Sequence, residues 1–204
     1  MNGLDTVLER SRELGFLGPG PIAGHVEHAT GFADGSDETP GRVLDLGSGG
    51  GVPGLVLAQL WPEAEVTLLD AGQRRCEFLL EAVQELGWEE RVHVVRARAE
   101  EAGHTTALRA TFDLVVSRAF GPPAVTAECG APFLRVGGRL VVSEPPASAD
   151  EDQARWPAAG IAQLGLARAE EWRKPFHYQA FVLERPCPER YPRRVGVPAK
   201  RPLF

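Results

Sequence analysis

Residues 43–54 have the sequence VLDLGSGGGVPG, and this run constrains the fold more than any other part of the chain. Its glycines argue against the interior of a helix or strand, because each would cost about 1 kcal/mol there relative to alanine. Three apolar residues, Val43, Leu44 and Leu46, lead into the run, and Pro53 lies near its end. The run therefore predicts a buried strand that ends in a tight turn, where a neighbour comes so close to the backbone that no side chain fits.

The glycine run begins a regular alternation of strand-like and helix-like segments. Strands that alternate with helices form a mostly parallel sheet with helices on both faces, so we expect an α/β fold. Ligands bind such sheets beyond the carboxyl ends of the strands, which is where the glycine run lies. The expected strands are 42–46, 65–70, 91–97, 112–119, 138–144, 166–173 and 176–185, and the expected helices are 4–16, 22–33, 53–60, 73–86, 122–134 and 147–156.

Composition divides the chain into three parts. With 204 residues, 43% of them hydrophobic, the chain has the size of one compact domain. A polar segment rich in glycine and proline, 31–41, ends a short helical N-terminal extension at 1–41 and precedes the alternating domain at 42–185. The remainder, 186–204, is a basic C-terminal tail.

Charge and cysteine content exclude several classes of protein. The net charge of −6 gives no overall attraction to nucleic acid, so any such binding must come from a local basic patch. The three cysteines are widely spaced and form no CxxC pair, which argues against a disulfide framework and a zinc site. His25 and His28 have a spacing that can ligate a metal, but a surface pair is the simpler interpretation, and we predict no metal.

The N-terminus lacks the apolar core of a signal peptide and no segment is apolar enough to cross a membrane, so a cytoplasmic location without membrane contact is expected.

The glycine turn fits two kinds of nucleotide site. Gly49, Gly51 and Gly54 satisfy G-x-G-x-x-G, and Asp70 follows Gly51 by 19 residues, which suits a nicotinamide or flavin oxidoreductase. However, Asp45 precedes the glycines, and the resulting D-L-G-S-G-G-G resembles motif I of the class I S-adenosylmethionine (SAM) methyltransferases. A carboxylate in this turn is a poor neighbour for a pyrophosphate and a good one for the cationic methionine end of SAM, which it can meet directly or by holding the loop.

Two further positions are candidates for cofactor contact. Asp70 ends the second strand, and its carboxylate can accept both hydroxyls of a ribose; the alternative is that it caps the helix at 73–86. Ala99 and Glu100 follow the third strand. In class I methyltransferases this place meets the adenine ring, whose amine can be recognised by backbone groups and a nearby acid.

The order of four motifs identifies a family resemblance. VLDLGSGGGVPGLVLA, TLLDAGQRRCEFL, RARAEE and SRAF, with PRRVGVPAKRPL in the tail, resemble the glucose-inhibited division protein B family of SAM-dependent 16S ribosomal RNA guanine-N7 methyltransferases. The resemblance covers about residues 42–204. It implies a Rossmann-like class I methyltransferase fold, SAM as cofactor, and 16S rRNA or the 30S subunit as partner. It also implies a catalytic role for Arg118. The cofactor-binding residues expected from the turn and the resemblance together are Asp45, Gly47, Ser48, Gly49, Gly51, Asp70, Ala99 and Glu100.

Substrate contacts are expected on two surfaces. Arg118 and Phe120 follow the fourth strand, where Arg118 can donate to guanine O6 or a phosphate and Phe120 can stack on a base. Their alternatives are an exposed ion pair and a core packing position. The tail has six basic residues from Arg185 onward against one acid, which suits either phosphate contact or packing over the sheet. The candidates within the tail are Arg193, Arg194, Lys200 and Arg201.

Other acceptors remain open because the chain departs from the family pattern. The N-terminal region is short, the chain is acidic, and the fifth strand ends in Glu144 where the family has a lysine followed by glycine. These features favour, as the alternative, a methyltransferase of the same fold acting on a small molecule or peptide, with His25, His28 or Glu144 as candidate base. A nicotinamide oxidoreductase and a SAM-binding regulator without turnover are further alternatives.

Overall fold

The computed structural model describes residues 3–34, 38–145, 155–173 and 175–204. The strands in these residues form one seven-stranded sheet. The strand order is β3-β2-β1-β4-β5-β7-β6. The first five strands are parallel, and β7 runs antiparallel to both β5 and β6. This confirms the predicted α/β fold with a mostly parallel sheet. The strands are β1 (Arg42–Leu46), β2 (Glu65–Asp70), β3 (Val92–Arg96), β4 (Phe112–Ser117), β5 (Leu134–Glu144), β6 (Leu166–Trp172) and β7 (His177–Leu183).

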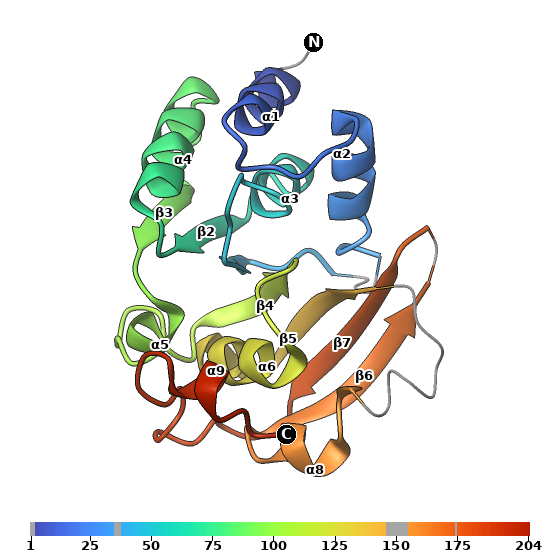
Figure 1. Cartoon of the computed structure of the whole chain (residues 1–204), viewed down its shortest axis with the longest axis vertical. Coiled ribbons are helices and arrows are strands. Elements are labelled where there is room, and N and C mark those ends of the chain that lie inside the picture. The colour runs from blue at the N-terminus through green and yellow to red at the C-terminus, as the bar shows by residue number, and fades with distance from the viewer. Residues whose placement is uncertain (1–2, 35–37, 146–154, 174) are drawn as a thin grey trace.

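Helices cover both faces of this sheet (Figure 1). One face carries α1 (Gly3–Glu13), α2 (Ile22–Thr30), α3 (Gly54–Leu60) and α4 (Gln73–Glu85). The other face carries α5 (Ala99–Ala102), α6 (Pro123–Gly130), α8 (Ala158–Ala162) and α9 (Val197–Lys200).

The two layers of helices build two hydrophobic clusters, one on each face. Successive residues of a strand point to opposite faces, so Val43 packs in the cluster beneath α1–α4 while Leu44 and Leu46 pack in the other. Leu4, Val7 and Leu8 of α1 belong to the first cluster, so the N-terminal helices share the core of the sheet.

Several predicted boundaries are wrong. The helix expected over 122–134 ends at Gly130, and a 3-10 turn at Ala131–Phe133 leads directly into β5, four residues earlier than expected. Pro132 lies in that turn and lacks the N–H that a continuing α-helix requires. The helix expected from Pro53 begins at Gly54. Of the helix expected over 147–156, only Arg155 and Trp156 lie within the described residues.

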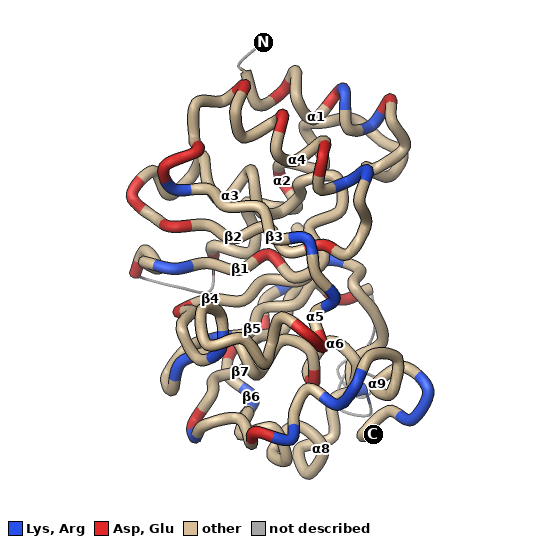
Figure 2. The backbone as a smooth tube through the Cα atoms, turned by 90° about the vertical axis from the view of Figure 1, so that its left-hand side faces the viewer, with Lys and Arg blue, Asp and Glu red and all other residues tan. Residues whose placement is uncertain are grey.

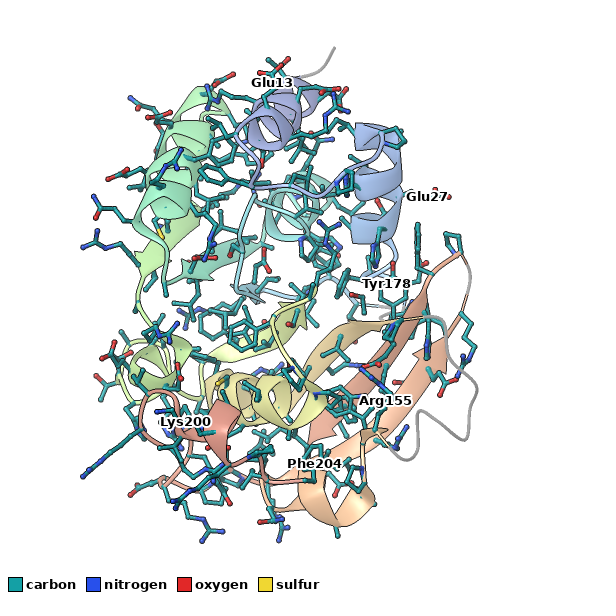
Figure 3. All side chains as sticks on the ribbon, viewed as in Figure 1. Glu13, Glu27, Arg155, Tyr178, Lys200 and Phe204 are labelled. Carbon is teal, nitrogen blue, oxygen red and sulfur yellow. The ribbon has the colours of Figure 1, made fainter. Side chains whose placement is uncertain are left out.

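The N-terminal helices are fastened over the sheet by polar contacts as well. Ser11 Oγ donates to Gly50 O at 2.9 Å, which ties α1 to the glycine turn. Tyr178 Oη on β7 donates to His28 O of α2 at 2.6 Å, and Figure 3 shows Tyr178 between these two elements. These contacts fix α2 beside the carboxyl ends of the strands. Within the part of the chain that the structure describes, no helix is long and apolar enough to cross a membrane.

Candidate active site

A cavity of about 530 Å³ lies at the carboxyl ends of β1, β2, β3 and β4. The turns after all four strands border it, as expected for a ligand site in a parallel sheet. Phe16 and Gly18, from the segment between α1 and α2, close one side together with His25 of α2; the sequence motifs do not identify Phe16 and Gly18. The predicted site residues that line this cavity are Gly47, Ser48, Gly49, Asp70, Ala99, Glu100, Arg118 and Phe120.

The glycines of the turn are required by different neighbours. At Gly47, where φ is +77°, an added Cβ would lie 2.6 Å from Cδ2 of Phe120. At Gly50 it would lie 2.8 Å from Phe16 O, between α1 and α2. At Gly49, which borders the cavity, the nearest atom would be Gly47 O at 3.7 Å, so this backbone has open space in front of it. The glycine run thus serves close packing within the protein as well as access to the cavity.

Asp45 and Gly51 lie behind the cavity wall. Asp45 is completely buried, and its Oδ2 accepts the Gly54 N–H at 2.9 Å while its backbone O accepts the Ser48 hydroxyl. Its Oδ1 has no hydrogen-bond partner among the described residues. Burial raises the pKa of this carboxyl to about 7, against the opposing effect of the Gly54 N–H. Of the two roles predicted for Asp45, the contacts favour holding the loop.

The Asp70 carboxylate is occupied by donors from the protein. Oδ2 accepts the Gly49 N–H at 2.9 Å, and Oδ1 accepts the Gly72 N–H at 2.7 Å. Arg75 adds two more bonds to Oδ1, from Nε at 2.9 Å and Nη2 at 2.8 Å. Asp70 does not cap α4, whose N-cap is Gly72 with no side-chain bond. A ribose that donates to both oxygens would compete with Arg75 at Oδ1. Arg75 lines the cavity and was not predicted.

The end of β3 supplies the wall opposite the glycine turn. Ala97, Arg98, Ala99 and Glu100 line the cavity, and Glu100 Oε1 accepts the Gly196 N–H of the tail at 3.0 Å. This bond brings the tail behind the predicted adenine position.

A second cavity, of about 470 Å³, adjoins the first. The two share His25, Arg118, Ala119 and Phe120, so these residues form the wall between them. Arg118 is half-buried, its Nη1 lies 3.4 Å from His25 Nδ1, and burial lowers the pKa of its guanidinium. Ala119 adopts φ +56°, an uncommon conformation for a residue with a side chain.

The histidines of this region are held by neighbours. His25 Nε2 lies 3.0 Å from Gly18 O, and His28 stacks on Phe176 with ring centroids 4.4 Å apart. Burial, reinforced by the charge of Arg118, lowers the pKa of His28 to about 4 and also lowers that of His25. His28 is therefore neutral at physiological pH.

Glu144 ends β5 at the border of the second cavity. Its Oε2 accepts Arg155 Nε at 2.8 Å, and its Oε1 accepts Trp156 Nε1 at 2.8 Å. The acid at the end of β5 is thus paired with a guanidinium from later in the chain.

The basic tail packs across α5 and α6. Glu128 is completely buried, and its carboxylate accepts Arg193 Nε at 2.8 Å and Nη2 at 2.6 Å. The guanidinium of Arg193 is therefore committed to the protein, which favours the packing alternative for this residue. Arg194, Lys200 and Arg201 are exposed, and Figure 2 shows the backbone of Lys and Arg residues, in blue, gathered around α9.

Comparison with known proteins supports one family. The model of a family described as rRNA small subunit methyltransferase G matches residues 26–164. A protein of that name from Symbiobacterium thermophilum is 40% identical over 190 residues, covering 87% of this chain and 76% of the relative. Another, from Deinococcus radiodurans, is 39% identical over 168 residues, covering 80% and 66%.

Solved structures agree on the fold. A putative O-methyltransferase from Klebsiella pneumoniae superposes with a TM-score of 0.65 at 17% identity, covering 91% of each chain. The cofactor-bound Rv0187 protein from MTB superposes with a TM-score of 0.64 at 21% identity, covering 90% of each chain. The class I methyltransferase fold predicted from the glycine motif is confirmed.

Proposed function

Because the chain belongs to the rRNA small subunit methyltransferase G family, we propose that it transfers the methyl group of SAM to N7 of a guanine in 16S rRNA, with the 30S subunit as its physical substrate. The observation that carries this proposal is the pair of adjoining cavities. One lies on the glycine turn, and the other lies behind the wall formed by Arg118, Ala119 and Phe120. Methyl transfer needs such an arrangement, because donor and acceptor must be held in line across a short distance.

The residues of the first cavity fit SAM. Its volume of about 530 Å³ lies within the usual range for small-molecule sites. Leu46, Leu69 and Ala97 offer apolar contact for the adenine, and Glu100 lies beside them. The Gly49 backbone offers space on the glycine turn, and Asp45 sets the shape of that turn from behind. SAM supplies an activated methyl group on a positively charged sulfur.

The chemistry of guanine N7 fits the second cavity, whose described lining residues include no strong base. N7 carries a lone pair in the plane of the ring and no proton, so its methylation requires no proton abstraction. The low pKa of His28 makes it a weak base, and both oxygens of Glu144 accept hydrogen bonds. A hydroxyl acceptor would need a base at this place, so the electrostatics favour N7 over the small-molecule alternative.

Arg118 is the proposed catalytic residue. It borders both cavities, and its guanidinium can donate to O6 of a guanine while N7 faces the methyl group. This contact withdraws no proton and fixes the orientation of the base. Phe120 lies at the same wall and can stack on the base.

The exposed residues Arg194, Lys200 and Arg201 are proposed phosphate contacts. They lie on the side of the molecule where the tail packs, and Figure 3 labels Lys200 on α9. A local basic surface of this kind gives an acidic protein the means to bind RNA.

The test is methyl transfer from labelled SAM to 30S subunits and to naked 16S rRNA, both from a strain without its own guanine-N7 enzyme. Label at N7 of one guanine supports the proposal, and a preference for subunits over naked rRNA identifies the physical substrate. SAM binding without label in either RNA would contradict it and favour another acceptor.

A further inference from the structure

The end of β5 carries a buried carboxylate, paired with a partly exposed arginine, that the proposed chemistry does not use. The side chain of Glu144 is 3% exposed, yet both of its oxygens have partners, Arg155 Nε and Trp156 Nε1, each at 2.8 Å. A carboxylate buried in this way is stable only when its partners are held in place.

Trp156 provides a rigid anchor for that pair. It is 2% exposed, and its ring lies 4.6 Å from the ring of Phe181 on β7. Because Arg155 precedes Trp156 directly, two adjacent residues are fixed on one carboxylate. The position of the Arg155 guanidinium is therefore determined by β5 and β7 together, and Figure 3 labels Arg155 on the side where these strands pair.

The two terminal nitrogens of the Arg155 guanidinium are available to a ligand. The side chain is 37% exposed and borders the second cavity, as does Arg118. Only Nε bonds to Glu144, and within the described parts of the chain Nη1 and Nη2 have no hydrogen-bond partner. Two parallel N–H donors on one guanidinium match the oxygens of a phosphate.

We propose that Arg155 binds a phosphate of the target nucleotide at the rim of the second cavity and that Glu144 is its positioning residue. This inference rests on the proposed function. Enzymes that modify a base take the base into a pocket while its phosphates stay outside. Arg118 and Phe120 lie at the shared wall, next to the proposed site of the methyl donor. The more exposed Arg155 borders only the second of the two cavities. Arg155 at the rim is thus placed to bind the RNA backbone, and Arg118 at the shared wall is placed to bind the base.

The first test compares Arg155→Ala with wild type in steady-state methylation of 30S subunits. We expect KM for the subunits to rise about tenfold with kcat changed less than twofold and the SAM dissociation constant unchanged. The salt dependence of KM should become shallower by about one counterion. Unchanged KM and salt dependence would overturn the proposal.

A double variant that removes both charges of the pair separates the effect on RNA binding from the effect on folding. Arg155→Ala leaves Glu144 buried without its cation, which lowers the melting temperature. The double variant Arg155→Ala, Glu144→Gln removes both charges and should recover the melting temperature while keeping the raised KM. Recovery of KM together with stability would mean that the pair is purely structural.

Glu144→Gln alone tests the positioning role. Its amide has one acceptor oxygen and no charge, so it cannot accept from both Arg155 and Trp156, and KM should rise by a smaller factor with the pH profile of kcat unchanged. A collapse of kcat and a changed pH profile would instead make Glu144 a base. Arg135→Ala is the matched control, because Arg135 is paired with Asp113 at the opposite end of β5 from Glu144 and should leave KM unchanged.

A binding experiment keeps the inference separate from the proposed function. Guanosine 3′,5′-bisphosphate and guanosine are titrated into the protein with S-adenosylhomocysteine present. The bisphosphate should bind at least tenfold more tightly, and Arg155→Ala should remove that preference. Failure of methylation with this preference intact would contradict the rRNA substrate alone; absence of the preference would overturn the role of Arg155.

Discussion

The ring of Phe120 lies against Gly47, so closely that a Cβ at position 47 would lie 2.6 Å from Cδ2 of the ring. This contact joins the turn after β1, which borders the first cavity, to the turn after β4, which borders both. The shape of the proposed donor site therefore depends on the same packing that sets the acceptor wall.

Gly47→Ala should weaken both SAM binding and turnover. The new methyl group displaces Phe120, and an alanine at φ +77° costs about 1 kcal/mol or more. We expect SAM affinity to fall about tenfold, measured by calorimetry, and kcat to fall with it. Gly87→Ala is the control, because Gly87 has φ +68° with nothing within 4 Å of the added Cβ. Equal effects of the two variants on SAM binding would contradict the role of the Phe120 contact.

Substitution of Asp70 should weaken SAM binding, whereas substitution of Arg75 should not. Asp70→Ala removes the proposed ribose acceptor and should weaken binding by about 1–3 kcal/mol. Arg75→Ala removes the guanidinium that occupies Oδ1 and should leave binding equal or tighter. Both dissociation constants are measured by calorimetry. Weaker binding in Arg75→Ala would mean that Arg75 itself contacts the cofactor.

Arg118→Lys should separate catalysis from cofactor binding. A lysine keeps the charge but loses the planar fork that orients a base. We expect kcat on 30S subunits to fall by about 100-fold, or roughly 3 kcal/mol, with SAM affinity changed less than threefold. A loss confined to SAM affinity would place Arg118 among the cofactor contacts.

Asp45→Asn should change how stability depends on pH. Burial raises the pKa of Asp45 from 3.8 to about 7, so in the wild type its contribution to stability is present below the unfolded pKa and is lost as the pH rises toward 7. Asparagine does not ionise. The free energy of unfolding of the variant, relative to wild type, should therefore rise between about pH 5 and pH 7 by up to about 1.4 kcal/mol per pH unit.

Urea denaturation at several pH values measures this difference. The lowered pKa of His28 acts with the opposite sign, since its contribution is lost as the pH falls, but His28 is present in both proteins and cancels. A difference in stability that is constant with pH would contradict the raised pKa of Asp45.

Arg193→Ala should destabilise the fold. It leaves the carboxylate of Glu128 buried without its cation, which costs about 3 kcal/mol or more. Arg194→Ala, at the next and exposed position, should change the free energy of unfolding by less than about 0.5 kcal/mol and weaken 30S binding in a salt-dependent way. Equal stability of the two variants in chemical denaturation would contradict the packed tail.

The sequence predicted most of what depends on local pattern. The strand, turn and helix around Gly47–Gly54 follow from contiguous residues, as does the position of Asp70 at the end of β2. α5, α8 and α9 have four or five residues each, too few to show a helical period. The early start of β5 depends on its pairing with Phe112, which no local pattern reveals.

The missing parts of the site come from tertiary packing. Phe16 reaches the cavity because α1 is fastened to Gly50, and nothing near Phe16 in the sequence signals this. In the sequence, Arg75 is one of several polar residues on α4, and only the structure shows that it bonds to Asp70. From the sequence, Glu144 indicated a negative charge at the end of β5. Only the structure shows that Arg155 places a guanidinium beside it.

The wall shared by the two cavities has an evolutionary consequence. Only His25, Arg118, Ala119 and Phe120, among the described residues, border both spaces. Residues that border only the second cavity, such as Glu144 at the end of β5, do not form part of the lining of the first. Under the proposed function, the acceptor preference can therefore change while the binding of the methyl donor is retained.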